Sequence, residues 1–403
     1  MEIRQLTPED REAFAKLGRY AFEPVKNTYE DVVPEDYEKT HPYLKDMTQV
    51  YGKFDGKDLV AAGAFFSTLL MNRQKELPMA GIWGVSTKPT HRRKGFIKQI
   101  LAYLLKEMYS NDILISTLYP FKFSFYEQYG WKLANENQRF HIETDKFITK
   151  PVNRTVREVY GLDHIKEVYS NIVLSSKYNY MTKRTDNEWR MKVNPKNPGY
   201  LFVCYDENEI PCGYIIERFL DYELQITEGL DKSGESIYLS EIFWYERETR
   251  QALFNFLKTH DDHRKYILFS SAESNLLASL KEARIKANEV FPGSMARIVN
   301  LKGVIESFEY PIDVQFIIHV KDDICNWNNG NFSIKISNGK AVIEKSDKNP
   351  EVTIDIGSLT QMVVGFADAS ELYDSWNIDS SKDLLSTLDQ LFPKQNNFFR
   401  DFF

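Results

Sequence analysis

The sequence contains few cysteines and no long apolar stretch, and these absences exclude several classes of protein. Three of its 403 residues are cysteines, Cys204, Cys212 and Cys325, and none belongs to a CxxC or CxxH pair. A disulfide framework is therefore excluded, and we predict neither structural zinc nor another metal. No apolar run approaches the roughly 18 residues of a membrane-spanning helix, and the charged start MEIRQLTPEDREAF lacks the apolar core of a signal peptide. We expect a cytoplasmic protein without a membrane span.

Basic residues are also fewer than acidic residues. The 51 Lys and Arg residues are outnumbered by 58 Asp and Glu residues, which gives a formal net charge of −7. Binding to nucleic acid requires a basic surface, so we expect no nucleic-acid partner. The same balance suits a cationic substrate. A chain of this length exceeds one typical hydrophobic core, so we expect two or three domains.

The most informative stretch is residues 81–109, GIWGVSTKPTHRRKGFIKQILAYLLKEMY. Its beginning, 81–87, reads as a buried strand whose glycines let a ligand approach the backbone closely. The basic turn Arg92-Arg93-Lys94-Gly95 follows, and apolar residues between Phe96 and Met108 then recur with the 3.6-residue period of a helix. A glycine turn at a helix N-terminus favours an anion, because backbone N–H groups and the helix dipole point toward it. The turn matches neither the Walker GxxxxGK[ST] pattern nor the Rossmann GxGxxG pattern.

Two motifs in this part of the chain resemble those of the GNAT N-acetyltransferases. Residues 92–97 are similar to the [QR]-x-x-G-x-[GA] loop that binds the pyrophosphate of acetyl-CoA, although Ile97 departs from the usual small last residue. Taken alone, this loop is also compatible with a solvated basic turn before a core helix. The segment FYEQYGW at 125–131 is similar to the F-Y-x-x-x-G-[FWY] segment that closes many GNAT domains. The expected order of strands and helices in 1–150 is the GNAT order as well, which favours the functional interpretation.

Further strands and helices are expected in the middle of the chain, which indicates a second domain. Its expected elements are a helix at 165–173, a hairpin of strands at 200–205 and 213–217, and a helix at 249–258. This region is compatible with a second copy of the first fold. It contains no second glycine loop of the same pattern, so we predict that it lacks a cofactor site.

The last part of the chain predicts a third domain. Asn-Gly turns at 329–330 and 338–339 indicate hairpins, and the segment NNFFRDFF at the end is aromatic enough to pack against the protein. Strands are expected at 314–320, 331–336, 340–345 and 352–356, and helices at 359–364 and 382–391.

Together these regions resemble the enhanced intracellular survival (Eis) family of acetyltransferases over essentially the whole chain. The resemblance is most specific at 85–95, at Phe125-Tyr126, at 295–299 and at the aromatic end. It implies an α+β fold with tandem GNAT folds, each a mixed and mostly antiparallel central sheet with flanking helices, followed by a sterol-carrier-like α/β domain. It also implies a homo-oligomer, either a trimer or a hexamer. The implied domains are 1–150, the catalytic GNAT domain; 151–290, a second GNAT-like domain without a cofactor site; and 291–403, a sterol-carrier-protein-like domain whose C-terminus reaches the active site.

The resemblance further assigns roles to individual residues. Acetyl-CoA would be the cosubstrate, Tyr126 the general acid on the CoA thiolate, and the α-carboxylate of Phe403 the general base. Tyr126 is also compatible with a simple core position, and either Phe402 or Phe403 fits the aromatic position of the family. The cofactor-binding set implied by the resemblance is Val85, Ser86, Thr87, Arg92, Arg93, Lys94, Gly95 and Phe96.

Several acidic residues are candidates for holding a cationic amine, with solvated surface charge as the alternative. The chemistry of amine acetylation agrees with the assigned roles, because an alkylammonium (pKa ~10.4) must lose a proton and the leaving thiolate (parent pKa ~8.5) must gain one. We expect an acetyl-CoA-dependent N-acetyltransferase that transfers acetyl directly to a cationic small molecule of aminoglycoside or polyamine type. The alternatives are a protein lysine N-acetyltransferase and a lipid- or CoA-binding module without catalysis. The candidate substrate-binding residues are Glu23, Glu30, Asp31 and Asp401.

Overall fold

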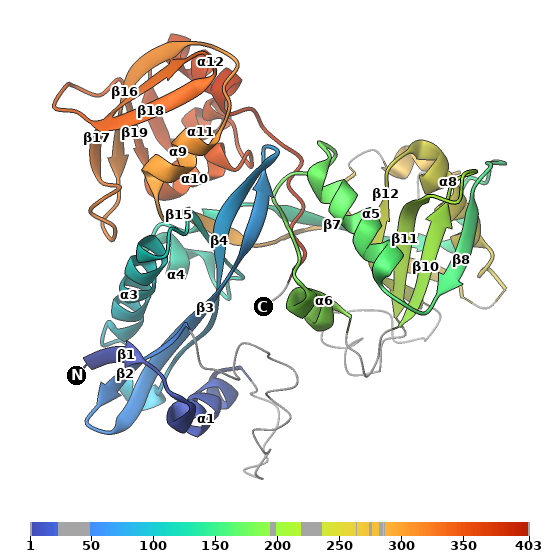
Figure 1. Ribbon diagram of the computed structural model, residues 1–403, viewed down its shortest axis with the longest axis horizontal. Coiled ribbons are helices and arrows are strands. Elements are labelled where there is room, and N and C mark those ends of the chain that lie inside the picture. Colours follow the sequence, from blue (N-terminus) through green and yellow to red (C-terminus); the bar gives the residue numbers. More distant parts are fainter. Residues whose placement is uncertain are drawn as a thin grey trace.

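Three β-sheets, each with its own helices, organise the described part of the chain in the computed structural model (Figure 1). The structure describes residues 2–22, 49–193, 199–218, 236–262, 264–273, 276–281, 285 and 287–401. In Figure 1 the first sheet lies below the third, and the second sheet lies to their right. No helix among the described residues is both long and apolar enough to cross a membrane.

The first sheet is mixed and mostly antiparallel. Its strands are β1 (Glu2–Gln5), β2 (Val50–Asp55), β3 (Asp58–Asn72), β4 (Lys75–Thr87), β5 (Ile115–Leu118), β6 (Lys132–Leu133), β9 (Met181–Thr182) and β15 (Met295–Ile298). The order is β1-β2-β3-β4-β5-β15-β6, with β9 paired to β3, and β4 and β5 run parallel. Strands β3 and β4 form a long hairpin that closes at Arg73 and Gln74, whose φ values of 50° and 60° suit the turn that matches strand twist.

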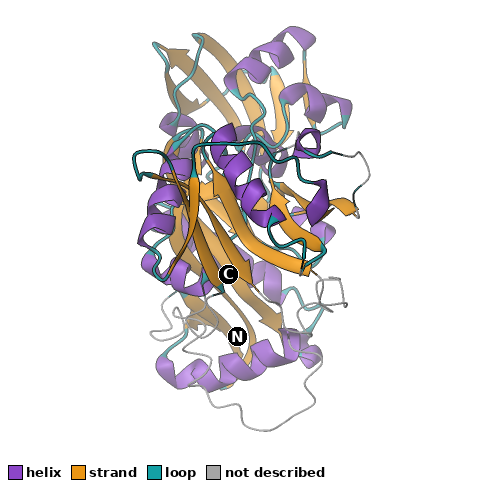
Figure 2. Ribbon diagram, turned by 90° about the vertical axis from the view of Figure 1, so that its right-hand side faces the viewer, coloured by secondary structure: helices purple, strands orange, loops and turns teal. Residues whose placement is uncertain are grey.

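Two helices cover opposite faces of this sheet, because side chains alternate along β3. Ala62 and Ala64 pack with Phe14 of α1 (Arg11–Phe22). Ala61 and Phe65 pack in the cluster that holds the apolar face of α3 (Phe96–Ser110). Figure 2 shows helices flanking the strands in this side view. A short helix, α4 (Phe123–Glu127), follows β5.

The second sheet repeats the plan of the first. Its strands are β7 (Glu136–Glu143), β8 (Thr155–Val159), β10 (Tyr200–Tyr205), β11 (Pro211–Arg218), β12 (Ser236–Trp244), β13 (Tyr266–Ser271) and β14 (Ala287–Pro292). Its helices are α5 (Asp163–Leu174), α6 (Asp186–Lys192) and α8 (Arg247–Lys258). The order is β14-β7-β13-β12-β11-β10-β8, with β12 and β13 parallel. The unit β12-α8-β13 thus corresponds to β4-α3-β5, and the predicted hairpin and both predicted helices are present.

The third sheet has the order β18-β17-β16-β19-β20. Asn338 and Gly339, with φ values of 51° and 74°, form the predicted two-residue turn between β17 and β18. The other predicted turn, Asn329-Gly330, lies instead in the loop that leads into β17, where the Asn329 side chain accepts from the Asp322 N–H. The elements are β16 (Val314–Lys321), β17 (Gly330–Ser337), β18 (Lys340–Lys345), β19 (Val352–Asp355), β20 (Ile378–Ser380), α9 (Leu301–Ser307), α10 (Ile356–Val363), α11 (Ala369–Asp374) and α12 (Lys382–Leu391).

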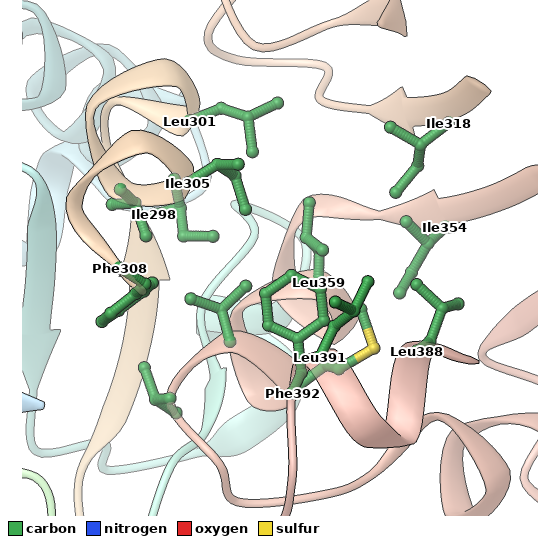
Figure 3. Packing of buried hydrophobic residues seen from close by; sticks show 14 of the residues in the cluster. Ile298, Leu301, Ile305, Phe308, Ile318, Ile354, Leu359, Leu388, Leu391 and Phe392 are labelled. Atoms are coloured by element: carbon green, nitrogen blue, oxygen red, sulfur yellow. The ribbon is translucent and has the colours of Figure 1, made fainter. Parts of the chain in front are cut away.

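The core of the third domain continues into the first sheet. Figure 3 shows Leu301 and Ile305 of α9 beside Ile298 of β15, with Leu359 facing them from α10. The tip of the β3–β4 hairpin also docks here, because the Arg73 guanidinium lies 4.9 Å from the Phe308 ring centroid. The first and third domains therefore share one continuous apolar cluster.

Strand exchange makes the domain boundaries differ from those that the sequence predicts. The expected division at 150/151 places β7 in the first domain, yet β7 pairs with β13 and β14 of the second sheet. The expected division at 290/291 places β15 in the third domain, yet β15 inserts between β5 and β6 of the first sheet. Sequence composition changes near 150 and 290, but pairing partners are set by long-range packing that composition does not report.

A buried ion pair fastens this exchanged strand. Arg297 of β15 and Asp322 are both fully buried, and their Nη2–Oδ2 distance is 2.7 Å. Arg297 also donates to the carbonyl oxygen of Tyr129. Gly130 lies beside this pair with φ of 86°, and a Cβ at Gly130 would lie 1.9 Å from Arg297 Nη1.

Gly130→Ala is therefore expected to destabilise the fold strongly. The change strains the backbone by about 1–2 kcal/mol, and it forces the buried guanidinium away from Asp322, for which about 3–5 kcal/mol is typical. The control is Gly56→Ala, since Gly56 has φ of 59° but no atom within 4 Å of the added Cβ. Chemical denaturation of both variants measures the difference, and equal losses of stability would contradict the argument.

Candidate active site

A bulge in β4 lies at the centre of the candidate site. Ala62 pairs with Ser86 and Ala64 pairs with Trp83, so two residues of β4, Gly84 and Val85, stand opposite one residue of β3. Gly84 has φ of 64°, and a Cβ there would lie 3.0 Å from the Phe14 ring of α1. Glycine is therefore required by both backbone and packing. A bulge re-aims the backbone groups around it, which is a common device beside active sites.

The two parallel strands of the first sheet separate beside this bulge. The β4–β5 ladder runs from Met79–Ile115 to Gly81–Thr117. Beyond Gly81, β4 continues to Thr87, and Trp83, Gly84 and Val85 are partly exposed. On the β5 side, this part of β4 has no partner strand within the described part of the chain. Its backbone N–H and C=O groups are thus positioned to bind an extended ligand that carries amide groups.

The basic turn forms a concave backbone loop at the N-terminus of α3. Arg93 and Gly95 both have left-handed backbones, with φ of 60° and 75°. Gly95 is the N-cap, and a Cβ on it would meet no atom within 4 Å. The first N–H groups of a helix have no acceptor within the helix, and left-handed turns of this kind aim successive N–H groups at one point. The loop is thus built to bind an anion.

The side chains of this loop strengthen its preference for an anion. Arg92, Arg93 and Lys94 are exposed, which brings three cations to the positive end of the α3 dipole. Phe96, in contrast, is buried and begins the apolar face of the helix. The Arg92 guanidinium lies 5.6 Å from the centroid of the Tyr20 ring, so α1 also borders the loop. All eight predicted cofactor-binding residues lie on the bulge, on the loop or on the connection between them. Among them, Ser86 and Phe96 are buried, whereas Val85 and Thr87 are partly exposed.

Tyr126 lies in α4, packed in the same apolar cluster as Ile82 of β4 and Phe96 of α3. Its side chain is 5% exposed, and its ring packs edge-on against Phe125. Burial raises the pKa of Tyr126 to about 12, so the phenol stays protonated at neutral pH. Its hydroxyl has no hydrogen-bond partner among the described residues and is available to donate a proton or a hydrogen bond.

The C-terminal tail passes beside the point where β4 and β5 separate. Phe399 is buried, and its ring centroid lies 5.3 Å from that of Tyr180. The Tyr180 hydroxyl in turn hydrogen-bonds the Thr117 hydroxyl at 2.9 Å, and Thr117 pairs with Gly81. Tyr119, just after β5, also packs against Phe399. The tail, Tyr180 and the end of β5 thus form one connected set.

Tyr126 and the helix that follows the loop pack in the apolar cluster on one face of the first sheet, whereas Phe399 and Tyr180 pack in the cluster on the other face. The tail thus approaches from the opposite face, near the point where β4 and β5 separate. Phe403, Phe402, Glu23, Glu30 and Asp31 lie outside the described residues. The Asp401 carboxylate, predicted to hold substrate, instead accepts from Arg184 Nε at 2.8 Å. The sequence does not predict Tyr180 and Thr117 as part of the site. Neither an isolated tyrosine nor a threonine within a strand belongs to a motif that marks a site.

The corresponding position in the second domain is unsuited to an anion. Helix α8 begins after β12 with Glu246 as N-cap, and Glu248 lies in its first turn. Two carboxylates at a helix N-terminus repel a phosphate group. The backbone of β12 is occupied as well, because Lys177 Nζ donates to the Trp244 carbonyl at 2.7 Å. That this domain lacks a cofactor site stays a prediction.

Comparison with known proteins assigns each part of the chain to a class. Residues 2–134 match a family model described as acetyltransferase (GNAT) domain, and residues 181–298 match a second model with the same description. Residues 301–400 match the sterol carrier protein domain. The chain is thus a GNAT acetyltransferase with two GNAT domains followed by a sterol carrier protein domain, as the motifs in its sequence predict.

Similar proteins come from several bacteria. An uncharacterised N-acetyltransferase of Streptomyces avermitilis is 21% identical over 342 residues, covering 80% of this chain and 81% of that protein. A crystal structure of a probable N-acyltransferase of unknown function from Enterococcus faecalis covers 100% of this chain and 99% of its own, with a TM-score of 0.87 and 21% identity. Eis1 of Mycobacterium abscessus covers 100% of both chains, with a TM-score of 0.79 and 15% identity. The fold is therefore Eis-like throughout.

Proposed function

We propose that this enzyme transfers acetyl from acetyl-CoA directly to an amine of a cationic small molecule, of aminoglycoside or polyamine type. The observation that supports this most is the combination on β4 and α3 of a glycine bulge, an unpaired strand edge and a basic left-handed loop. The unpaired edge suits the amides of a pantetheine chain, and the loop suits a pyrophosphate. The GNAT class, to which both domains belong, uses acetyl-CoA as donor.

The residues of the first domain would divide the work of binding. Arg92, Arg93 and the N–H groups at Gly95 would hold the pyrophosphate through charge and hydrogen bonds. Beyond Gly81, the backbone of β4 would hold the pantetheine. Acetyl-CoA supplies an activated acyl group, so no covalent enzyme intermediate is needed. The Val85 N–H would donate to the thioester oxygen as negative charge develops there.

Two proton movements are required, and the chain offers a group for each. Tyr126, kept neutral by burial, would donate toward the sulfur of the leaving group. The α-carboxylate of Phe403 would accept a proton from the attacking amine, directly or through a water. A terminal carboxylate has a parent pKa of about 3.5, so it needs burial or a water relay to act as a base. The course of the tail beside Tyr180 and Thr117 supports this assignment.

The proposed acceptor is an amine of a cationic molecule. The net charge of −7 suits a polycation, and Glu23, Glu30 and Asp31 are the acidic residues proposed to hold it. A consumption assay for acetyl-CoA over aminoglycosides, polyamines and lysine-containing peptides tests the proposal. Turnover with aminoglycosides or polyamines is the expected result, and exclusive turnover with peptides would favour a protein lysine acetyltransferase. Acetyl-CoA binding without turnover of any amine would favour a binding module.

Calorimetry is expected to find one acetyl-CoA site per chain. Replacing Arg92 and Arg93 by alanine is expected to weaken this binding by about tenfold or more, because each cation contributes a charge-assisted contact to phosphate. The matched control is Arg154→Ala, which removes an arginine that pairs with Glu246 beside α8 of the second domain. Two sites per chain, or equal weakening by the control, would contradict the assignment of the site to the first domain.

A further inference from the structure

The C-terminal tail lies where the two parallel strands of the second sheet separate. The β12–β13 ladder runs only from Ser236–Tyr266 to Tyr238–Leu268. Arg400 of the tail donates to Ser270 Oγ of β13 at 2.5 Å and to Tyr238 OH of β12 at 3.4 Å. Phe398 packs against Phe243 of β12, with ring centroids 5.6 Å apart. In the first sheet, the equivalent separation is the proposed binding place of the cosubstrate.

The tail brings one acidic side chain into a buried group of charges. Arg184 Nη2 lies 2.5 Å from Glu241 Oε1 and 2.6 Å from Asp401 Oδ1. Lys192 Nζ lies 3.0 Å from the same oxygen of Glu241. The side chains of Arg184 and Glu241 are each 2% exposed, and that of Asp401 is 13% exposed. Asp401 is one of the two carboxylates that face these two cations, and Arg400 of the tail is a further cation near Lys192.

The other three charges belong to the second domain, and two of them, Arg184 and Glu241, also have partners outside the tail. Arg184 directly precedes the N-cap of α6, and its guanidinium lies 4.0 Å from the centroid of the Tyr169 ring. Burial works against charge on Arg184, but Asp401 and Glu241 raise its pKa well above the usual range. Burial likewise disfavours the Glu241 carboxylate, yet Arg184 and Lys192 hold its pKa below the usual range. Without Asp401, the second domain would bury a net positive charge, which is unfavourable.

Hydrogen bonds to backbone groups also hold the three tail residues that precede Asp401. Lys192 Nζ donates to the Arg400 carbonyl at 3.1 Å, and Asn135 Nδ2 donates to the Phe399 carbonyl at 3.2 Å. The Phe398 N–H donates to the Asn179 carbonyl at 2.9 Å. Two residues follow Asp401 in the sequence, and an extended chain covers about 3.5 Å per residue. Fixing Asp401 therefore keeps the Phe403 Cα within about 7 Å of the Asp401 Cα, and thereby restricts the position of the terminal carboxylate.

We propose that the second GNAT domain is the receptor of the C-terminal tail, binding Asp401 at a buried cationic site between β12 and α6. Arg184 and Lys192 are positioning residues, which act on the proposed reaction only through the tail. In this proposal, the domain predicted to lack a cofactor site binds an anionic residue of its own chain. The consequence for catalysis rests on the proposed role of the Phe403 carboxylate, whereas the docking of the tail does not.

Release of the C-terminal phenylalanines by a carboxypeptidase tests the docking directly. Asp401→Asn keeps the shape of the side chain and removes its charge, so the release rate is expected to rise by about tenfold over the wild type. Asp401→Glu, which keeps the charge on a longer side chain, is expected to lie between the two. The control is Lys394→Ala, which removes an exposed pair with Glu371 at the start of the tail and is expected to leave release unchanged. A release rate for Asp401→Asn equal to that of the wild type would overturn the proposed receptor.

Turnover measured on the same variants separates the receptor from the proposed base. The expected result for Asp401→Asn is a kcat about tenfold lower with an unchanged KM for acetyl-CoA, because positioning is lost while donor binding is kept. Faster release with unchanged kcat would support the receptor and overturn the catalytic role of the chain end. Lower kcat with unchanged release would overturn the receptor, because Asp401 would then act on the reaction without holding the tail.

Discussion

Replacing Tyr126 by phenylalanine is expected to lower kcat by about a hundredfold and to leave the KM for acetyl-CoA near its wild-type value. The hydroxyl is the only group removed, and general acid catalysis typically contributes about 10²–10⁴ in rate. Its raised pKa of about 12 keeps it protonated, so the wild-type rate should show no alkaline decline due to this group below about pH 11. Steady-state kinetics across pH 6–10 measures both effects.

Tyr129→Phe provides the matched control for this variant. Tyr129 lies three residues further along, it is similarly buried, and its ring also packs against Phe125. Its hydroxyl has no assigned role, so near wild-type kinetics are expected. The Tyr126 hydroxyl has no partner among the described residues, so its loss should barely change the melting temperature. A preserved kcat in Tyr126→Phe would assign the proton donor elsewhere, and equal losses in both variants would indicate a packing effect.

Converting the Phe403 α-carboxylate to an amide is expected to lower kcat by about a hundredfold while acetyl-CoA affinity stays intact. An amide has nearly the shape of a carboxylate but cannot accept the proton of the attacking amine. Semisynthesis by ligation of a C-terminal peptide amide supplies this protein, and ligation of the free acid supplies its control. Calorimetry with acetyl-CoA and initial-rate kinetics separate binding from catalysis.

Extending the chain by two glycines after Phe403 tests the same group in a simpler way. The carboxylate is moved away from its place by up to about 7 Å, so a comparable loss of kcat is expected. The same two residues placed before Met1 serve as the control, since they add length without touching the tail. An extended or amidated protein that keeps its full kcat would rule out the terminal carboxylate as base.

Local sequence patterns predict the elements that local interactions determine. The apolar spacing of 96–108 predicts α3, and the Asn338-Gly339 pair predicts its hairpin turn, because each depends on residues a few positions apart. The glycine loop and the Tyr126 segment were also visible, since the backbone geometry of an anion site constrains its residue types. These local features lead to the correct class of protein.

The features that the sequence does not predict depend on residues far apart in the chain. The local sequence pattern of 136–143 does not indicate that β7 pairs with β13 rather than with a strand of the first sheet. The Asp401–Arg184 pair joins residues 217 positions apart, and surface charge was therefore the more common expectation for this aspartate. The Thr117–Tyr180 bond was missed for the same reason. Contacts between side chains far apart in the chain produce no periodic pattern of residue types in the sequence.

The exchange of β7 and β15 also sets the order in which the protein can fold during synthesis. Met295 of β15 pairs with Leu118, so the first sheet cannot close until the ribosome has delivered residues up to Ile298. The N-terminal GNAT domain therefore matures only after the second domain has emerged, which departs from the usual folding of domains in chain order. Until then, the edges of β5 and β6 stay unprotected, and they are the places where chaperone binding or misassembly would begin.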